Sequence, residues 1–588
     1  MESQDLNTLL WGSLVVGEAT VASAAALKIT GQSAAPGLSG KVAAMMAADT
    51  TTWVVAAILL AIMGVSTALV VGWLRQLLHP DTAASGARPA DFQDMHEKQA
   101  VKRAQVILAD SLPDDADKAV GKELVRYMGE LDGKSLNAQY EDPESTYAVT
   151  RAGKTRSLVA RRVLEAPGAV LATSTKVDGI GLTWLGRLKA TGGRTWAFDP
   201  MGKSLGPLPI RWNPVLGCEN FDTARERGRA FALGATTRIG SGNTKWFVER
   251  GAQILGYFFH AAGIAGVDID AIHRWVSNPD EAVEVLDSLG TRTSQMMVSA
   301  LRDLMIYMAA ETSSGFKGTM QGALEPVMID SVLETLTPPR EESFDVAGFL
   351  HSKDVVWVLS PESEGAVASV TTMFVDHVLH TALRMSDMLP GGRFTPPISL
   401  PLDEAANVAA LPNIDSVYSE AAGHGIFVSG FFQDEAQVTK RWGEQTAKTI
   451  FQQSRAVYAL GGSKDAEWNK KIADLSPEYE EERTSVTAGR MGTSTSTHTE
   501  RRHVLRESDV AGLPHGRAVL VAAGHPAVVV SLTDIKADPR WGADVETGQR
   551  IYDDHLRRLQ RAGSAAEREA LRQQMTGWMD TEGRMAAL

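Results

Sequence analysis

The strongest constraint on the fold is a run of 22 residues without a charged side chain, residues 53–74. At a rise of about 1.5 Å per residue, a helix of this length covers the roughly 30 Å hydrocarbon core of a bilayer. Trp53 and Trp73 stand at or near its two ends, where indole rings favour the membrane interface. Soluble helices seldom continue this far without a charge. The run therefore predicts a membrane span, and a buried soluble helix is the alternative.

A second apolar stretch, residues 6–27, predicts a first span, although Glu18 lies near its middle, where a carboxylate is costly. An amphipathic surface helix is the alternative for this stretch. Basic residues are more frequent after residue 74 than between the two stretches, which favours a cytoplasmic location for the rest of the chain. We expect residues 1–78 to form a two-span anchor in membrane lipid. The protein would then be a multi-pass protein of the inner (cytoplasmic) membrane, with its main body in the cytoplasm.

Composition limits the class of protein and its partners. Acidic residues outnumber basic ones 71 to 58, and the net charge of −13 argues against a basic exterior that coats nucleic acid. It does not exclude a local basic channel. Cys218 is the one cysteine of the chain, which excludes an intramolecular disulfide and a multi-cysteine zinc site. We expect it to be a packed small residue in a reducing compartment.

From about residue 146 onward, short β-branched runs alternate with helical stretches. Apolar strands that alternate with helices predict a parallel sheet covered on both faces, and hence an α/β fold. The interval 218–338 has no strand pattern and predicts an inserted all-helical domain, with one helical layer of a single large domain as the alternative. The predicted strands are residues 146–149, 169–173, 195–199, 355–359, 398–402, 426–432 and 456–460, with a hairpin of 518–523 and 527–532.

These patterns divide the chain after the anchor into five parts. Residues 79–145 are a cytoplasmic linker that leads into the sheet domain, residues 146–217 and 339–540 are its two halves, and residues 218–338 are the helical insertion. Residues 541–588 form a charged helical tail whose basic runs predict a solvated helix face. Residues 476–503 are polar and predict a mobile loop or linker. In the insertion, Arg225, Arg227 and Arg229 form a basic cluster that we interpret as a solvated helix.

Residues 148–155, AVTRAGKT, are similar to the phosphate-binding pattern G-x-x-x-x-G-K-[ST]. Gly153 allows the backbone to turn its N–H groups toward a phosphate, Lys154 supplies a positive charge, and the Thr155 hydroxyl is a ligand for Mg²⁺. Ala148 replaces the usual first glycine, and its methyl group restricts φ. A surface loop that contains GKT by chance is the alternative. The residues predicted to bind a nucleotide are Thr150, Arg151, Ala152, Gly153, Lys154, Thr155 and Arg156.

An acidic pair and a glutamine follow two later strands. Residues 398–404, ISLPLDE, predict a strand that ends in Asp403 and Glu404, although Pro401 is awkward because proline cannot donate to a central ladder. One acid of such a pair holds the water shell of Mg²⁺ and the next activates the attacking water. Residues 425–433, GIFVSGFFQ, place Gln433 at the end of a strand, where an amide can sense a γ-phosphate. A helix-start acid pair and a surface amide are the alternatives.

Several longer stretches accompany these motifs, and together they resemble one family, the type IV coupling proteins, which are hexameric ATPases of conjugation and type IV secretion. The similarity is closest to the actinobacterial branch. The stretches are AVTRAGKT, APGAVLATSTK at 166–176, WAFDPMG at 196–202, RWNPVLGCENFDTARERG at 211–228, KWFVERGAQILGYFFHAA at 245–262 and LDEAANVAALPNIDSVYSEAAGHGIFVSGFFQDEAQVTKRWG at 402–443.

The resemblance implies a RecA-like P-loop ATPase domain with an inserted all-α domain and N-terminal transmembrane helices. It implies a homo-hexamer that uses ATP and Mg²⁺ to pump single-stranded DNA or protein. The implied partners are a relaxase bound to that DNA and the inner-membrane components of a type IV secretion system. Carried over to this sequence, Lys154, Glu404 and Gln433 are the catalytic residues, and Thr155 and Asp403 hold the metal.

Relatives often have an arginine before the sensor strand that is proposed to reach a neighbouring subunit, and this sequence has His424 there. A neutral histidine is a poor substitute for an arginine finger, so Arg441 or Arg151 would have to serve. Two other functions stay open at this point. One is a membrane-anchored adaptor with a degenerate nucleotide site that does not hydrolyse ATP, and the other is a double-stranded DNA translocase of the chromosome-segregation type.

Overall fold

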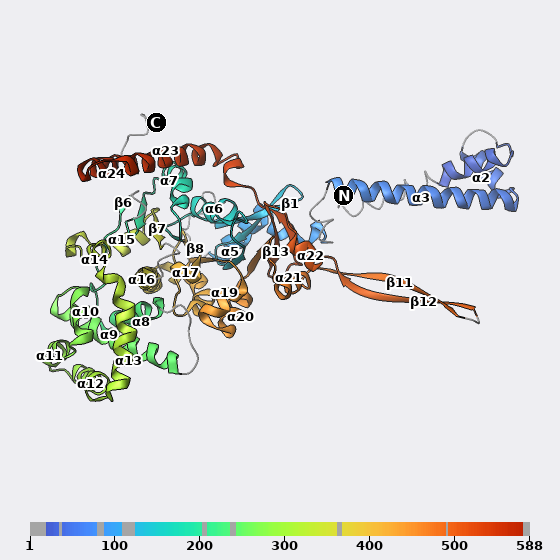
Figure 1. The fold of residues 1–588 in the computed structure, drawn as a ribbon. Coiled ribbons are helices and arrows are strands. Elements are labelled where there is room, and N and C mark those ends of the chain that lie inside the picture. The colour runs from blue at the N-terminus through green and yellow to red at the C-terminus, as the bar shows by residue number, and fades with distance from the viewer. Residues whose placement is uncertain are drawn as a thin grey trace. The chain divides into compact units, whose positions relative to one another are not determined.

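A computed structural model describes residues 19–34, 38–78, 87–108, 124–202, 208–235, 243–360, 367–489 and 492–579 of the chain. The residues fall into two compact units, Met1–Ala84 and Ser85–Leu588. Figure 1 labels the helices and strands of the chain in order from the N-terminus (blue) to the C-terminus (red).

The N-terminal unit contains a long apolar helix, α3 (Thr50–Leu78), beside α2 (Leu38–Met46) and a shorter helix, Ala19–Ile29. A small core of Ala26, Leu27, Met45 and Ala56 joins them. Within the described residues, one helix is long and apolar enough to span a membrane; its segment Thr50–Thr67 has a mean hydropathy of 1.8 and is 11% buried. Most of the other predicted span, residues 6–27, lies outside the described residues. Multi-pass insertion therefore stays a prediction.

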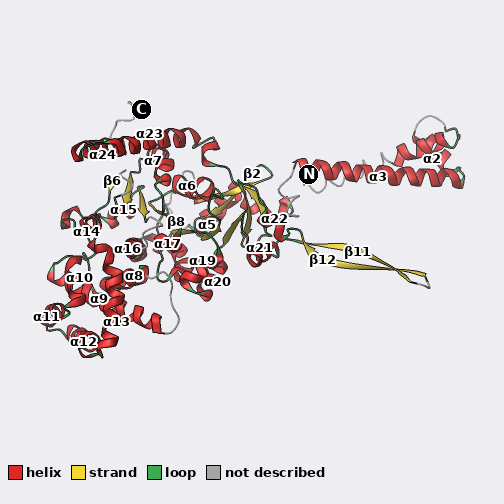
Figure 2. Cartoon of the chain, viewed as in Figure 1, coloured by secondary structure: helices red, strands yellow, loops and turns green. Residues whose placement is uncertain are grey.

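The second unit is built on a twelve-stranded sheet, in the order β2-β1-β14-β13-β10-β3-β9-β8-β4-β7-β5-β6 (Figure 2). The strands from β10 to the end of that order, β10-β3-β9-β8-β4-β7-β5-β6, are parallel to one another. At the other side, β13, β14, β1 and β2 add antiparallel pairs, the first of them between β13 and β10. The strands are β1 (Val125–Leu131), β2 (Lys134–Gln139), β3 (Glu144–Tyr147), β4 (Val170–Ser174), β5 (Thr195–Phe198), β6 (Leu208–Pro209), β7 (Val355–Leu359), β8 (Ile398–Asp403), β9 (Ile426–Phe432), β10 (Ala456–Leu460), β13 (Arg517–Ala522) and β14 (Val528–Ser531).

Helices cover both faces of this sheet, as the continuous apolar runs of its strands predict. On β7, Val356 and Val358 belong to one core, while Val355, Trp357 and Leu359 belong to the core on the opposite face. Every residue of β7 is buried, because alternate side chains point to opposite faces and both faces are covered. Each sheet strand predicted from the sequence is present. Pro401 is accommodated in β8, where it pairs with Ser429 of β9.

The first core is covered by the helices between β6 and β7, which we call the helical region (residues 221–336), and by helices of the later part of the chain. The core is continuous between the helical region and the sheet, so the two belong to one compact unit. The helical region comprises α8 (Phe221–Gly234), α9 (Asn243–Ala265), α10 (Ile269–Ser277), α11 (Asp280–Ser288), α12 (Arg292–Leu301), α13 (Ala310–Leu324) and α14 (Asp330–Leu336). The later helices are α15 (Val346–Leu350), α16 (Ala368–Ser386), α17 (Ala405–Val408), α18 (Ile414–Glu420), α19 (Glu435–Trp442), α20 (Glu444–Gln453), α21 (Ala466–Ala473) and α22 (Glu507–Ala511).

The second core is covered from the other side by the helix that follows β3, by α7 and by the C-terminal helices. The predicted solvated tail is only half right. Its basic face is exposed, but Trp184 of α7 donates to the backbone oxygen of Gly548 at 3.0 Å, and Tyr552 is buried against Gly181. The helices on this side are α6 (Ala160–Leu164), α7 (Asp178–Thr191), α23 (Gly542–Arg561) and α24 (Ala565–Met579). Helix α5 (Glu97–Ile107) precedes β1.

Two sequence predictions need correction. The polar segment 476–503 is not a loop: β11 (Glu478–Gly489) and β12 (Gly492–His503) pair as a long antiparallel hairpin (Figure 2). Threonine at every second position from 493 to 499 suits a strand, and its backbone hydrogen bonds are made within the pair. Within 218–338, the sequence also predicts one continuous helix over 293–312, but the helix there is interrupted after Tyr307, although the sequence contains no glycine or proline at that point.

A buried ionic cluster connects the strands on either side of β3. Glu144, the first residue of β3, lies 2.9 Å from Arg126 of β1 and accepts two hydrogen bonds from Arg162 of α6, at 2.6 and 3.0 Å. Ser429 of β9 donates to the same carboxylate at 2.5 Å, and Arg162 also donates to Tyr458 of β10. Burial opposes the charge, but the two guanidinium groups outweigh it and hold the pKa of Glu144 below its usual value.

We predict that Glu144→Gln lowers the free energy of unfolding by about 3–5 kcal/mol, because two buried guanidinium groups lose their counter-charge. Urea denaturation of the purified chain measures the loss, and Glu341→Gln, an exposed glutamate, is the matched control. Since the pKa of Glu144 is depressed by folding, its stabilisation is present above the ordinary value of about 4.3 and is lost as the pH falls through the folded value. Equal stability of the two variants near neutral pH would contradict this role.

Candidate nucleotide-binding site

The loop after β3 has the backbone geometry of a phosphate cradle. Arg151 and Gly153 have φ values of 68° and 90°, and Ala152 donates its N–H to the carbonyl of Val149 at 3.1 Å. The helix that follows begins with a π-helical turn, Thr155–Val159, and continues as α6. The positive end of this helix therefore lies beside the loop, where it favours an anion.

The replacement of the first glycine by Ala148 is compatible with this geometry. Ala148 is buried, its N–H donates to the carbonyl of Phe432 at 3.0 Å, and its φ is not positive. The left-handed conformations occur at Arg151 and Gly153. Arg151 thus carries the backbone strain of a non-glycine residue, roughly 1 kcal/mol or more.

The predicted acidic pair lies directly beside the loop lysine. The Lys154 Nζ lies 3.2 Å from Asp403 Oδ1 and forms an ion pair and hydrogen bond with Glu404 Oε1, across 250 residues of sequence. The three side chains are nearly buried. Burial disfavours the charged ammonium, but the two carboxylates outweigh it and raise the pKa of Lys154. Burial also raises the pKa of Asp403, against the opposing effect of Lys154.

Further hydrogen bonds hold the acidic pair in place. Thr173 of β4 donates to the backbone oxygen of Asp403 at 2.7 Å. Glu404 has a left-handed backbone with φ of 54°, and its Oε2 accepts hydrogen bonds from Gln433 at 3.2 Å and Asn407 at 3.4 Å. Gln433 at the end of β9 therefore contacts the acidic pair through Glu404, and its sensing of a γ-phosphate stays a prediction.

A cavity of 670 Å³ opens over these residues. Of the residues predicted to bind a nucleotide or metal, Thr150, Arg151, Gly153, Lys154, Thr155, Arg156, Asp403 and Glu404 line it. Ala152 does not; it packs against the core beneath the loop. Gln433 does not line the cavity either.

The sequence prediction missed the opposite wall of this cavity. Lys176 follows β4, which the strand pattern could have revealed, because the carboxyl ends of parallel strands meet at one edge of a sheet. The rest of the wall comes from the C-terminal part of the chain, including His515, Asp534, Lys536 and Gln549. Arg156 joins the loop to this wall through an ion pair with Asp534 at 2.5 Å.

The donor set suits a nucleoside triphosphate with Mg²⁺. The buried Asp403 Oδ1 faces the Lys154 ammonium at 3.2 Å and has no other hydrogen-bond partner in the described part of the chain, so it could accept from a metal-bound water once the ammonium moved to a phosphate. Thr155 would provide a hydroxyl ligand, and the cavity can hold a drug-sized molecule. No separate cluster of three or more histidine, cysteine or acidic side chains that could hold a metal occurs among the described residues.

Two residues considered as substitutes for an arginine finger are placed elsewhere. His424 lies at the opposite end of β9 from Gln433, and its ring is 2.7 Å from the Ser386 hydroxyl. Arg441 is buried and donates to the backbone oxygens of Leu233 and Gly234 at 3.1 and 3.3 Å. Arg441 is thus engaged within its own chain, and of the two candidates Arg151 is the exposed one.

Residues 397–515 match a family described as the TraM recognition site of TraD and TraG. Among solved structures, the bacterial conjugative coupling protein TrwBdeltaN70 in an unbound form is similar at a TM-score of 0.51 and 19% identity, over 68% of this chain and 88% of that one. The plasmid coupling protein TrwB with the ATP analogue ADPNP gives 0.52 and 17%, over 70% and 90%. TrwB with ADP and Mg²⁺ gives 0.51 and 17%, over the same shares. No curated protein sequence matches the chain.

The chain has the fold of a conjugative coupling protein. The resemblance inferred from the sequence motifs is thus confirmed for the fold and, over residues 397–515, by the family match. The α/β fold with a large parallel sheet is likewise confirmed, whereas the actinobacterial branch stays a prediction.

We predict that Lys154→Ala destabilises the chain more at about pH 8 than at about pH 5. Without the ammonium, burial and the neighbouring Glu404 raise the pKa of Asp403 further, and a raised carboxyl pKa means stability that is lost as the pH rises. Melting temperatures of wild type and variant at the two pH values measure this. Adding Glu404→Gln should restore part of the loss, because one of the two repelling charges is removed. A pH-independent difference would contradict the ion-pair account.

Proposed function

We propose that this chain is an ATP-driven coupling protein for conjugation or type IV secretion, which moves single-stranded DNA or protein toward a secretion channel. The observation that carries the proposal is the convergence of Lys154, Asp403 and Glu404 beside a phosphate loop, with Gln433 bonded to Glu404. Solved relatives with this fold contain ADPNP or ADP and Mg²⁺. The complete set of residues argues against an adaptor with a degenerate site.

The residues divide the chemistry as follows. Lys154 and the N–H groups at the start of the helix would hold the phosphates. Thr155 and Asp403 would hold Mg²⁺, which when bound supplies positive charge to the transferred phosphoryl group. Glu404 accepts a proton from the attacking water. Gln433 orients Glu404 through its hydrogen bond, and it moves when Glu404 separates from Lys154.

The ion pair of the resting site couples hydrolysis to binding. The Lys154 ammonium bonds to Glu404 Oε1 here, so this oxygen is not open to accept a proton. When a phosphate takes over Lys154, Glu404 is released to accept a proton. Hydrolysis of ATP would therefore require a phosphate in contact with Lys154.

The partners follow from the same proposal. We infer a homo-hexamer in the inner membrane that receives a relaxase with its single-stranded DNA and contacts inner-membrane components of the secretion system. The family that residues 397–515 match is described as the TraM recognition site of TraD and TraG. This description supports a role of these residues in recruiting a DNA-processing complex. Arg151 is exposed at the cavity and is the candidate for contact with a neighbouring subunit. A first span over residues 6–27 would make the anchor multi-pass.

We predict that Glu404→Gln retains nucleotide binding but lowers ATP hydrolysis by about a hundredfold or more, because the general base is lost. Gln433→Ala should cause a smaller loss, of about tenfold. Phosphate release by the full chain, with and without single-stranded DNA, measures both, and Glu341→Gln is the control for a removed surface charge.

Lys154→Ala should abolish both hydrolysis and conjugative transfer, because the phosphates lose their main cation. Undiminished transfer by this variant would overturn the motor model. Wild-type chain that binds nucleotide without turnover, even with DNA, would favour the adaptor instead.

A further inference from the structure

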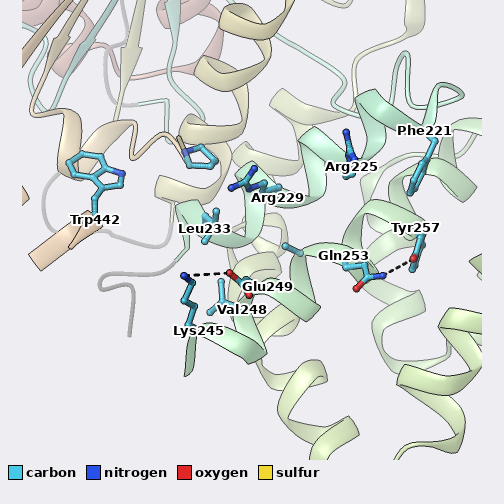
Figure 3. A pocket seen from close by; sticks show the side chains of 12 residues that line it. Phe221, Arg225, Arg229, Leu233, Lys245, Val248, Glu249, Gln253, Tyr257 and Trp442 are labelled. Carbon is cyan, nitrogen blue, oxygen red and sulfur yellow. Dashed lines mark hydrogen bonds and ion pairs between the residues drawn. The ribbon is translucent and has the colours of Figure 1, made fainter. Parts of the chain in front are cut away.

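A second cavity, of 620 Å³, lies between the helical region and the helices that follow β8 and β9 of the sheet. It shares no lining residue with the nucleotide cavity. Helices α8 and α9 form one side, and Pro412 and Trp442 form the other (Figure 3). Figure 3 shows Leu233 of α8 and Val248 of α9 on the helical side, with Arg225 and Arg229 of α8 above them. We call this cavity the α8–α9 groove.

The floor of the groove is apolar, and its aromatic rings are already packed. Phe221 stacks on Tyr257 with ring centres 5.8 Å apart and planes 10° apart. Trp442 is 8% exposed, lies edge-on to Phe432, and donates its indole N–H to the backbone oxygen of Leu411 at 2.9 Å. Single-stranded nucleic acids bind by stacking bases on open aromatic faces. The groove offers little such surface and is better suited to aliphatic side chains.

The rim of the groove is positively charged, although the chain has a net charge of −13. Arg225, Arg229 and Lys245 line it, against the single carboxylate of Glu249. Arg225 pairs with Asp222, but these side chains are 65% and 75% exposed, and Lys245 lies 3.8 Å from Glu249. Exposed pairs of this kind contribute little, so an incoming carboxylate can replace them at small cost.

One helix connects the groove to the nucleotide site. Helix α19 begins two residues after Gln433, which bonds to Glu404, and ends at Trp442 in the wall of the groove. Beside Trp442, Arg441 donates to the backbone oxygens of Leu233 and Gly234 at the end of α8. A shift of Gln433 is therefore carried by an eight-residue helix to both walls of the groove.

We propose that the α8–α9 groove binds an acidic, amphipathic helical segment of a partner protein, and that α19 couples this binding to the nucleotide site. Apolar side chains of the segment fill the floor, and its carboxylates pair with Arg225, Arg229 and Lys245. The coupling rests on the proposed ATPase function, whereas the docking does not.

The docking is tested with a fluorescent synthetic helix of about 16 residues, leucine on one face and glutamate on its flanks. A matched peptide with lysine for glutamate and an oligothymidylate of about 20 nucleotides are the comparisons. All are titrated against the full chain without nucleotide. We expect saturable binding of the acidic peptide alone, weakened at least about tenfold by Arg225→Glu with Arg229→Glu.

Arg274→Glu, the same charge reversal at an exposed, ion-paired arginine of α10, is the control and should leave binding unchanged. No saturable binding of the acidic peptide, or equal binding of the basic one, would overturn the docking proposal. Binding of the oligothymidylate that the double reversal abolishes would assign the groove to nucleic acid instead.

The coupling is tested by repeating the titration with saturating ADPNP and Mg²⁺. Reciprocity requires the nucleotide to change peptide affinity by the same factor by which peptide changes nucleotide affinity. Gln433→Ala should remove that factor while leaving peptide affinity without nucleotide unchanged. Independent binding of the two ligands to wild type would overturn the coupling. If the chain binds no nucleotide but still binds the peptide, the proposed motor function fails while the docking site stands.

Discussion

The geometry of the nucleotide site depends on one buried carboxylate. Glu144 begins β3, the strand that leads into the phosphate loop, and Arg162 lies on the helix that leaves it. Their two hydrogen bonds join the entry and the exit of the loop. Arg162 also donates to the Tyr127 carbonyl at 2.6 Å, so the antiparallel strands are tied to the same point. A buried ion pair is a costly way to gain stability, but the hydrogen bonds of this cluster specify one arrangement of these strands.

The order of the parallel strands then brings the rest of the site to the loop. Because β3, β9, β8 and β4 are neighbours in the sheet, their carboxyl ends place Lys154, Gln433, the acidic pair and Lys176 at one edge. Ligands bind at this edge in open α/β sheets. Without a bound phosphate, the same convergence brings a cation against two carboxylates, which is why the site forms an internal ion pair.

The sequence allowed the sheet and the phosphate side of the site to be predicted, because each depends on a local pattern. Strands buried on both faces are continuously apolar, and the loop and acidic pair follow them directly. Features that depend on long-range packing could not be predicted. Gln549 reaches the cavity because α23 packs on α7, and Asp534 reaches it because the segment after β14 packs beside the helix that follows the loop. The burial of Arg441 depends on the end of α8. The β11–β12 hairpin was missed because its strands are polar, and polarity was interpreted as a loop.

The link between the two cavities follows from where α19 begins and ends. If the Gln433 amide moved alone, the movement would affect only the nucleotide site. Here the amide is followed at once by a helix capped by Asp434, which accepts from the Gln437 N–H at 2.6 Å. A movement of this helix would therefore reach the helical region through Arg441 and the groove through Trp442. Because the helical region shares one continuous core with the sheet, such a movement changes the packing of both, and a partner held in the groove would affect it in return.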